Sequence, residues 1–176
     1  VGLGWVISNE PFFRGATEVI QYLKLRGTWG RVGNSQISGR RFAYLATVKD
    51  TNDTSYQFGK NMDQTYGTTA IDEYAVDVTW EIADKTNIGL DMRLLNNKFN
   101  LQFDAFKELR KGIYLRRTSI PSYFGMINNP YGNIGKVENK GIEMSVSYAN
   151  SWRDWSLSVM GNYSFNRNKV LEDDST

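Results

Sequence analysis

Hydrophobic and polar residues alternate along several stretches of the chain, most clearly over residues 155–165. There the odd positions carry mainly apolar or aromatic side chains, and the even positions carry mainly polar ones. Residues 142–148 alternate in the same way, and only residues 150–154 separate the two stretches. A two-residue period is typical of a β-strand with one apolar and one polar face, so this region is predicted to form a β-hairpin.

Four more stretches show the same alternation. They are residues 87–94 and 99–105, joined by Asn96-Asn97, and residues 1–7 and 23–29, separated by Asn9-Glu10-Pro11. Asparagine tolerates the positive φ angles of a tight turn, and proline interrupts a strand because it cannot donate a ladder hydrogen bond. The chain is therefore predicted to be all-β, with about six strands arranged in three pairs.

The connections and the strand lengths favour a membrane barrel over a soluble sheet. Polar stretches at 34–77 and 111–133 are far longer than an ordinary loop of about 4–6 residues, whereas the links within pairs are short or moderate. Strands of about 10–14 residues suit a tilted membrane strand, which needs roughly 9–11 residues to cross the hydrocarbon. We predict an antiparallel transmembrane β-barrel segment of about six long strands, with short periplasmic turns and long extracellular loops.

Aromatic residues near the predicted strand ends agree with this architecture. Tryptophan and tyrosine rings gather at membrane interfaces, where each ring meets both lipid and water. The residues in such positions are Trp29, Trp80, Tyr148, Trp152 and Trp155. They are typical of an aromatic girdle at the edges of an apolar band.

Two charged residues fall on the apolar side of the alternation. Asp84 and Lys107 would face lipid on uninterrupted strands, and a charge at mid-bilayer costs roughly 2–4 kcal/mol for Lys and less for Asp. Either both lie toward the aqueous end of their strands, or a β-bulge near Phe106 resets the alternation. A soluble β-sandwich that binds carbohydrate through exposed aromatic rings is an alternative, because its strands are also amphipathic.

The composition excludes most catalytic and metal chemistry. The 176 residues include no cysteine and no histidine, which excludes disulfides, thiol catalysis, imidazole bases and thiolate zinc sites. A formal net charge of +2 is too small for the clustered positive field of a nucleic-acid binder. We expect no enzyme activity, no catalytic residue, no metal, no cofactor and no nucleic-acid partner. A hydrolase with a carboxylate pair such as Asp91 and Glu143 would rest only on the presence of acidic residues.

Ten short strings, in order along the chain, resemble the barrel of SusC/RagA-type TonB-dependent transporters. They are NEPFF at 9–13, LKLRGTWG at 23–30, VGN at 32–34, WE at 80–81, TNIGLD at 86–91, LLNNK at 94–98, NIG at 133–135, NKGIE at 139–143, YSFN at 163–166 and NKV at 168–170. No single string is diagnostic, but the ordered set is specific. The resemblance covers nearly the whole chain apart from the two long loops.

The resemblance implies part of the carboxyl-terminal half of a barrel of about 22 strands in the outer membrane of a Gram-negative bacterium. Members of that family import oligosaccharides or peptides with energy relayed by TonB. The implied partners are a SusD-like surface lipoprotein, the TonB complex through other parts of the protein, outer-membrane lipid, and a glycan or peptide substrate. Residues 1–176 are expected to be a partial β-barrel domain that lacks a plug domain and cannot close alone.

Two sets of residues are candidates for functional contacts. The lumen-facing candidates are Lys24, Arg26, Asp91, Arg93, Asp104 and Glu143. They would guide substrate or hold a plug, or they would form ion pairs between strands along the inner wall. The loop contact candidates are Tyr44, Tyr56, Tyr66, Tyr123, Phe124 and Tyr131. Their rings would meet a sugar or a partner protein, or would pack within their own loops.

Overall fold

A computed structural model gives the fold of the chain. It describes residues 1–35, 42–62, 64–124 and 128–174, with only the backbone of residues 51–55, 64–66, 68, 70, 73 and 122. The strands are β1 (Gly2–Val6), β2 (Ile20–Asn34), β3 (Thr47–Phe58), β4 (Gln64–Glu73), β5 (Glu81–Leu94), β6 (Phe99–Arg116), β7 (Tyr131–Trp152) and β8 (Trp155–Glu172). Three short 3-10 helices accompany them, η1 (Ile7–Asn9), η2 (Pro11–Ala16) and η3 (Ser122–Phe124). The all-β prediction is confirmed.

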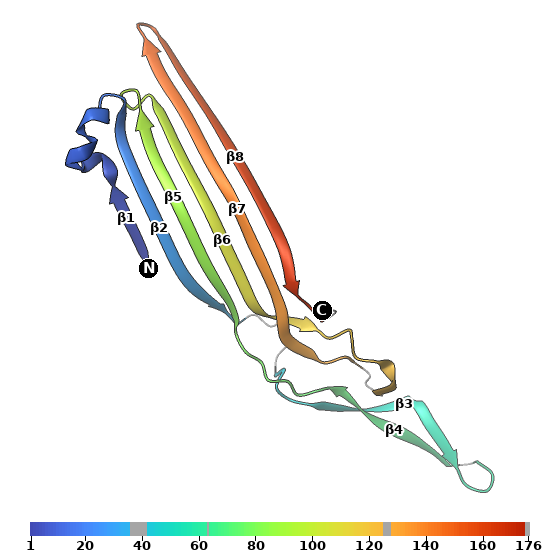
Figure 1. The fold of residues 1–176 in the computed structure, drawn as a ribbon. Coiled ribbons are helices and arrows are strands. Elements are labelled where there is room, and N and C mark those ends of the chain that lie inside the picture. The colour runs from blue at the N-terminus through green and yellow to red at the C-terminus, as the bar shows by residue number, and fades with distance from the viewer. Residues whose placement is uncertain (36–41, 63, 125–127, 175–176) are drawn as a thin grey trace. The chain divides into compact units, whose positions relative to one another are not determined.

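Two sheets contain these strands. The larger has six strands in the order β1-β2-β5-β6-β7-β8, and Figure 1 shows neighbouring strands running in opposite directions. The smaller pairs β3 with β4 in an antiparallel ladder. By its contacts the chain divides into a first unit, Val1–Val32 with Ala83–Arg110 and Val137–Val170, and a second unit, Gly33–Ile82 with Lys111–Lys136 and Leu171–Thr176.

The short connections of the first unit have the predicted turn chemistry. Leu95, Asn96 and Asn97, between β5 and β6, have φ angles of 54°, 57° and 63°. The β7–β8 turn is shorter than predicted from 150–154, because both strands continue to Trp152 and Trp155 and leave only two residues between them. Both turns lie at one end of the sheet, beside η1 and η2, which we call the short-turn end (Figure 1).

The connection between β1 and β2 explains why the first strand stops where it does. The Trp5 indole Nε1 donates a hydrogen bond to Glu10 Oε1 at 3.0 Å, and the Trp5 ring meets the Phe12 ring edge-on at 6.4 Å. Pro11 begins η2, where its missing N–H costs nothing. The chain therefore folds back over Trp5 before it enters β2.

The two predicted long loops contain more strand than the sequence indicated. The first polar stretch contains β3 and β4, and the second contains the end of β6 and the beginning of β7. Strands β6, β7 and β8 consequently reach 18–22 residues, longer than the expected 10–14, whereas β5 has 14. Threonine and tyrosine favour strands without producing a strict two-residue period, so the alternation ended before the strands did.

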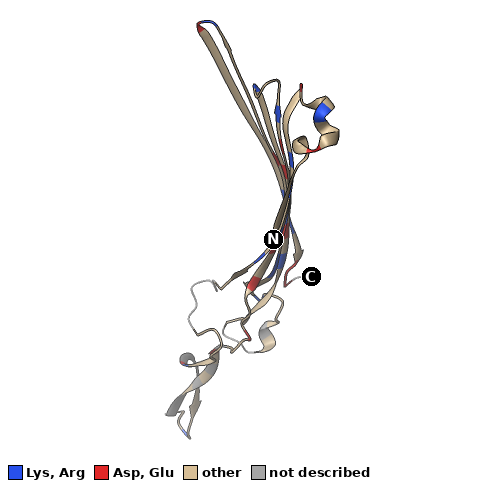
Figure 2. Cartoon of the chain, turned by 90° about the vertical axis from the view of Figure 1, so that its left-hand side faces the viewer, with Lys and Arg blue, Asp and Glu red and all other residues tan. Residues whose placement is uncertain are grey.

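The described residues form almost no apolar core. Only Ala43 and Tyr114 are buried among the hydrophobic residues, with 5% and 7% of their surface exposed. In the first unit, the strands form a single layer when viewed edge-on (Figure 2). A β-sandwich would bury one face of such a sheet against a second layer, so this arrangement contradicts the sandwich alternative. Among the described residues, no helix is both long enough and apolar enough to cross a membrane.

Candidate functional site

The register of the strands in the first unit follows from a few contacts. Residue Gly4 of β1 pairs with Arg26 of β2. The Arg31–Asp84 ion pair and the contact of the Arg26 guanidinium with Gly89 are consistent with one register of β2 with β5, and the Lys85–Glu108 ion pair indicates the register of β5 with β6. In antiparallel strands each step forward along one strand is a step backward along its neighbour. The residues that lie opposite one another along the rest of β1, β2, β5 and β6 therefore follow by counting from these contacts.

The remaining registers come from Gly141 of β7. A Cβ atom at Gly141 would meet the Phe106 ring on β6, and the Phe165 carbonyl and the Asn166 Cα on β8. One row of residues on the polar face therefore crosses the sheet from β1 to β8. Its members are Gly4, Arg26, Gly89, Asp104, Glu143 and Ser164.

Arg26, a member of this row, links three strands. Its Nε lies 3.3 Å from Asp91 Oδ1, and its Nη2 lies 2.6 Å from Asp104 Oδ2. The guanidinium lies over Gly89 of β5, because a Cβ atom there would be only 2.5 Å from Arg26 Cζ. The absence of a side chain at Gly89 is therefore what lets Arg26 reach from β2 to β6.

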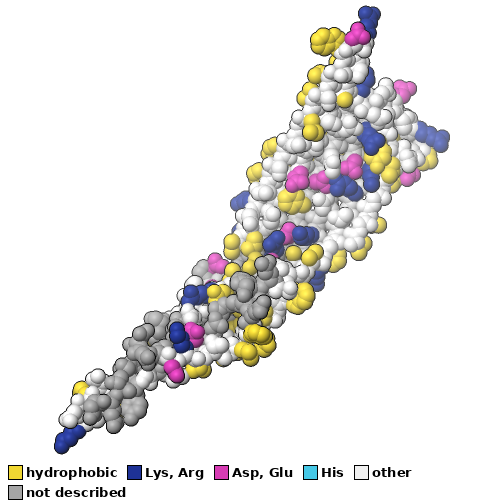
Figure 3. All heavy atoms as spheres, turned by 180° about the vertical axis from the view of Figure 1, so that it is seen from behind, with side chains coloured by type: hydrophobic (Ala, Val, Ile, Leu, Met, Phe, Trp, Pro, Cys, Tyr) yellow, Lys and Arg dark blue, Asp and Glu magenta, His cyan; other side chains and the backbone are white. Residues whose placement is uncertain are grey.

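Asp104 and Glu143 continue the row toward β8. The side chain of Asp104 is 12% exposed, and Gln102 Nε2 donates to its Oδ2 at 3.4 Å. Asp104 and Glu143 line a hollow together with Gln102, Ser145, Asn162 and Ser164. Asp104 Oδ1 is buried without a hydrogen-bond partner among the described atoms. Figure 3 views a face on which acidic and basic side chains gather among uncharged ones.

The other two lumen-facing candidates lie nearer the short-turn end. A Cβ atom at Gly4 would lie 3.1 Å from Lys24 Cε, so the lysine stem crosses the glycine. The Arg93 guanidinium carbon lies 5.0 Å from the centroid of the Tyr22 ring. The structure thus joins three of the six candidates by ion pairs and gives Arg93 an aromatic partner. Sequence reasoning did not find Gly89, although a glycine on the polar alternation of a strand was a usable signal.

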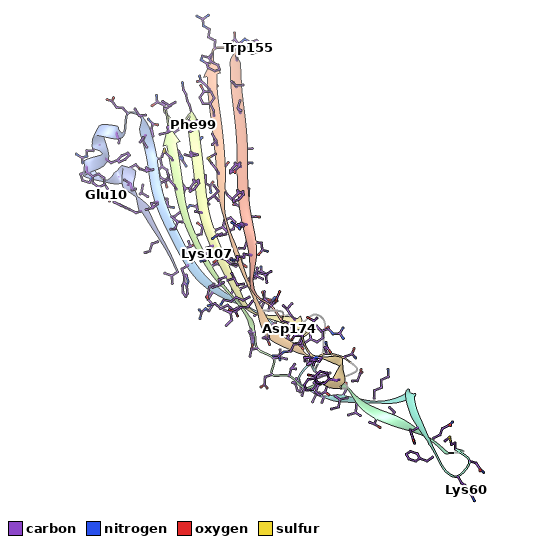
Figure 4. All side chains as sticks on the ribbon, turned by 45° about the vertical axis from the view of Figure 1, so that its right-hand side comes forward. Glu10, Lys60, Phe99, Lys107, Trp155 and Asp174 are labelled. Atoms are coloured by element: carbon purple, nitrogen blue, oxygen red, sulfur yellow. The ribbon has the colours of Figure 1, made fainter. Side chains whose placement is uncertain are left out.

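The opposite, apolar face carries rows of hydrophobic residues that end at ion pairs. Asp84 accepts hydrogen bonds from Arg31, at 2.6 Å from its Nε, and Lys107 Nζ lies 2.8 Å from Glu138 Oε2. Figure 4 places Lys107 well along β6 from Phe99, which lies near the short-turn end. Both unexpected charges therefore have partners, and they lie away from the short turns.

The alternation in β6 is not reset at Phe106. The Phe106 ring contacts Gly141 on the polar face. Lys107 lies on the apolar face, as Phe103 does, and pairs with Glu138. The backbone departs from regular strand geometry further along, at Gly112, where φ is +70°. The bulge near Phe106 is therefore not present, and ion pairing accounts for Lys107.

The described rings of the loop candidates each contact another aromatic ring. The centroid distances are 6.2 Å for Tyr44 and Phe42, 4.8 Å for Tyr56 and Phe58, 5.0 Å for Tyr123 and Phe124, and 5.2 Å for Tyr131 and Tyr114. Tyr44, Tyr56, Tyr123 and Phe124 remain well exposed, Tyr131 is partly covered, and Tyr114 is buried. The side chain of Tyr66 lies outside the described part of the chain.

Two polar side chains organise the second unit. The Asn133 side chain accepts a hydrogen bond from the Thr79 amide and donates to the carbonyls of Thr79 and Gly112, at 2.7–2.9 Å. The Asp174 carboxylate accepts hydrogen bonds from the backbone amides of Thr118 and Ser119. These hydrogen bonds, the one from the Ser119 amide first, hold the pKa of Asp174 below its ordinary value.

The family model and the most similar curated proteins that we compared identify the same family. The family described as "TonB dependent receptor-like, beta-barrel" matches residues 1–176. The chain is 30% identical over 174 residues to the TonB-dependent receptor SusC of Bacteroides thetaiotaomicron, covering 98% of this chain and 17% of that protein. It is 28% identical over 172 residues to the TonB-dependent receptor P3 of Formosa agariphila, covering 97% of this chain and 16% of that protein.

Solved structures agree on the fold. The chain resembles the RagAB peptide importer in its "closed-closed" state with a TM-score of 0.72 and 21% identity, over 97% of this chain and 18% of that one. The same importer in its "open-open" state gives the same TM-score with 22% identity, and the match covers 96% of this chain and 17% of that one. The chain therefore spans about one sixth of the length of these relatives.

Proteins of this family are transporters and receptors of the outer membrane rather than enzymes, so the expectations of localisation and of no catalysis are confirmed. The charged row on one face and the apolar rows on the other suit the wall of such a barrel. The chain belongs to the family of TonB-dependent receptor-like β-barrels, as a segment of the SusC/RagA type.

Proposed function

We propose that the chain forms part of the wall of an active importer in the outer membrane, energised through TonB. The observation that carries this proposal is the difference between the two faces of the sheet. One face has the ion-paired cluster of Arg26, Asp91 and Asp104, and the other has hydrophobic rows with no second layer over them among the described residues. A strand wall between lipid and a water-filled lumen requires this division.

In this proposal the apolar face meets lipid and the polar face meets the lumen. The short-turn end lies in the periplasm, and the two long polar stretches predicted from the sequence are extracellular. Trp152 and Trp155 flank the β7–β8 turn and are both exposed, which suits rings at the periplasmic interface. The wall contributes shape and lining, and no covalent chemistry takes place on it.

The charged row would serve the lumen in two ways. Arg26 bound to two carboxylates fixes the inner surface of β2, β5 and β6, so a plug would dock on a preformed pattern of charge. Lys24, Arg93 and Glu143 have no such pair among the described contacts and would remain available to substrate or plug. Residues 1–176 would then be a partial barrel domain completed by other strands.

The proposal also includes a cargo and two protein partners. RagAB is described as a peptide importer, which supports a peptide as the proposed cargo. An oligosaccharide is the other cargo that the sequence resemblance implies. The exposed rings of Tyr44, Tyr56, Tyr123 and Phe124 suit contact with a SusD-like lipoprotein or with the cargo. The TonB complex would act through parts of the protein outside this segment.

A depletion experiment tests the proposal. A strain carrying the full-length gene, a strain without it and a strain without tonB are grown on defined mixtures of oligosaccharides or peptides. Mass spectrometry of the medium then measures which components disappear. We expect gene-dependent loss of one class only, and no loss without tonB. Depletion that continues without tonB, or a full-length protein that fractionates as soluble, contradicts the proposal.

A further inference from the structure

Basic residues gather on the apolar face of the first unit, beyond the last hydrophobic row. Lys107 of β6 and Lys140 of β7 both contact Glu138, at 2.8 Å and 3.4 Å from its carboxylate oxygens. Arg167 and Lys169 of β8 share the alternation of Phe165 and therefore the same face. We call Lys107, Lys140, Arg167 and Lys169 the basic patch.

The register places three of these residues side by side. Gly141 faces Phe106 on one side and Asn166 on the other, so the adjacent Lys140 faces Lys107 and Arg167. A hydrogen bond from the Ala149 amide to the Lys98 carbonyl gives the same register for β6 and β7. Opposite residues in a sheet lie about 5 Å apart at Cβ, so three cations form one continuous row.

The charges in and around the patch do not balance. Glu138 is the carboxylate shared by Lys107 and Lys140, and its side chain is only 16% exposed. The two lysines remain 57% and 59% exposed. Four positive charges against one negative charge leave a net charge of +3, presented outward by flexible side chains. Nearby, Arg31 and Asp84 neutralise one another.

The height of the patch matches the boundary of a bilayer. Lys140 lies twelve residues from Trp152, and Arg167 lies twelve residues from Trp155. Twelve residues rise about 40 Å along a strand, which becomes about 28 Å across the membrane at a tilt of about 45°. The apolar band of such barrels is about 25 Å tall. The patch therefore lies just past the lipid tails, at the edge far from the short turns.

We propose that the basic patch binds the phosphate groups of lipopolysaccharide in the outer leaflet. This inference rests on the proposed function, because that function places the patch on the extracellular side. Lipid phosphates lie at this depth and carry the complementary charge, and an arginine next to lysines can hold phosphate oxygens with several donors. The patch would anchor the lipids that surround the wall at β6 to β8.

The experiment compares two charge-matched double variants of the full-length protein in detergent. K140Q/R167Q removes two cations from the patch, and K98Q/R153Q removes two exposed cations from the short turns. The binding of bisphosphorylated lipid A and of dephosphorylated lipid A is measured by native mass spectrometry. Each basic residue near an anionic lipid surface strengthens binding roughly fivefold, so K140Q/R167Q should bind bisphosphorylated lipid A about twenty-fivefold more weakly.

The wild type should prefer the bisphosphorylated lipid, and K98Q/R153Q should keep that preference. Equal binding of the two lipids, or an equal loss in both variants, overturns the assignment of the patch. Displacement of lipid A by inorganic phosphate at the same concentration also overturns it, because the site would then be a general anion site. Heat-modifiable migration on SDS gels separates the two proposals, since its absence in the wild type contradicts the barrel itself.

Discussion

Arg26 on β2 donates a hydrogen bond to Asp104 on β6 at 2.6 Å, although β5 lies between the two strands. Gly89 makes this possible, because any Cβ there would occupy the path of the guanidinium. Arg26 and Asp104 are only 26% and 12% exposed, so the pair is shielded from water more than a typical surface pair. A contact that skips one strand fixes three strands together.

Gly89→Ala should therefore break the Arg26–Asp104 contact. The guanidinium would swing away, and the largely covered Asp104 carboxylate would lose its charged partner. We expect the free energy of unfolding in urea to fall by about 1–3 kcal/mol. In an Arg26→Met background the same glycine substitution should have little effect, since no guanidinium remains to displace. Equal losses in both backgrounds would show that Gly89 acts through something other than Arg26.

Charge on the two faces of β8 should have unequal effects on membrane insertion. Val159 is on the apolar alternation and Ser158 on the polar one, and both side chains are exposed, so arginine fits sterically at either position. Val159→Arg would place a charge in hydrocarbon and cost roughly 2 kcal/mol or more, whereas Ser158→Arg would face water. The measurement is the yield of folded, heat-modifiable full-length protein in lipid vesicles. Equal yields from the two variants would contradict the assignment of Val159 to the lipid face and Ser158 to the lumen face.

Alternation predicted the two faces of the sheet because a two-residue period is visible within one strand. Asn96 and Asn97 predicted their turn for an equally local reason, since their φ angles depend on a few residues. The Arg26–Asp104 contact was not predictable, because it joins residues 78 positions apart and depends on the register of three strands. Strands β3 and β4 were missed because their polar sequences lack a clear period.

Gly141 should be far less tolerant of a side chain than Gly161. A Cβ at Gly141 would clash with the Phe165 carbonyl oxygen and would lie 2.8 Å from the Phe106 ring, and the carbonyl belongs to the neighbouring backbone. Relief would require β7 and β8 to separate, so we expect Gly141→Ala to lower the free energy of unfolding by about 1–3 kcal/mol. A Cβ at Gly161 would meet nothing within 4 Å, so Gly161→Ala should change it by less than about 0.5 kcal/mol. The comparison of urea midpoints checks both values, and similar losses would contradict the close contact.

Protonation of Asp174 should loosen the segment that follows β6. The carboxylate accepts hydrogen bonds from the amides of Thr118 and Ser119, and these bonds lower its pKa in the folded state. A lowered pKa means that the stabilisation is present above the ordinary value of about 3.9 and is lost as the pH falls through the lower, folded value. Hydrogen-exchange mass spectrometry of peptides containing Thr118 and Ser119 should show protection factors that fall at acid pH. In Asp174→Asn the protection should already be low and should not vary with pH in this range, and an unchanged acid loss in that variant would assign the transition to another group.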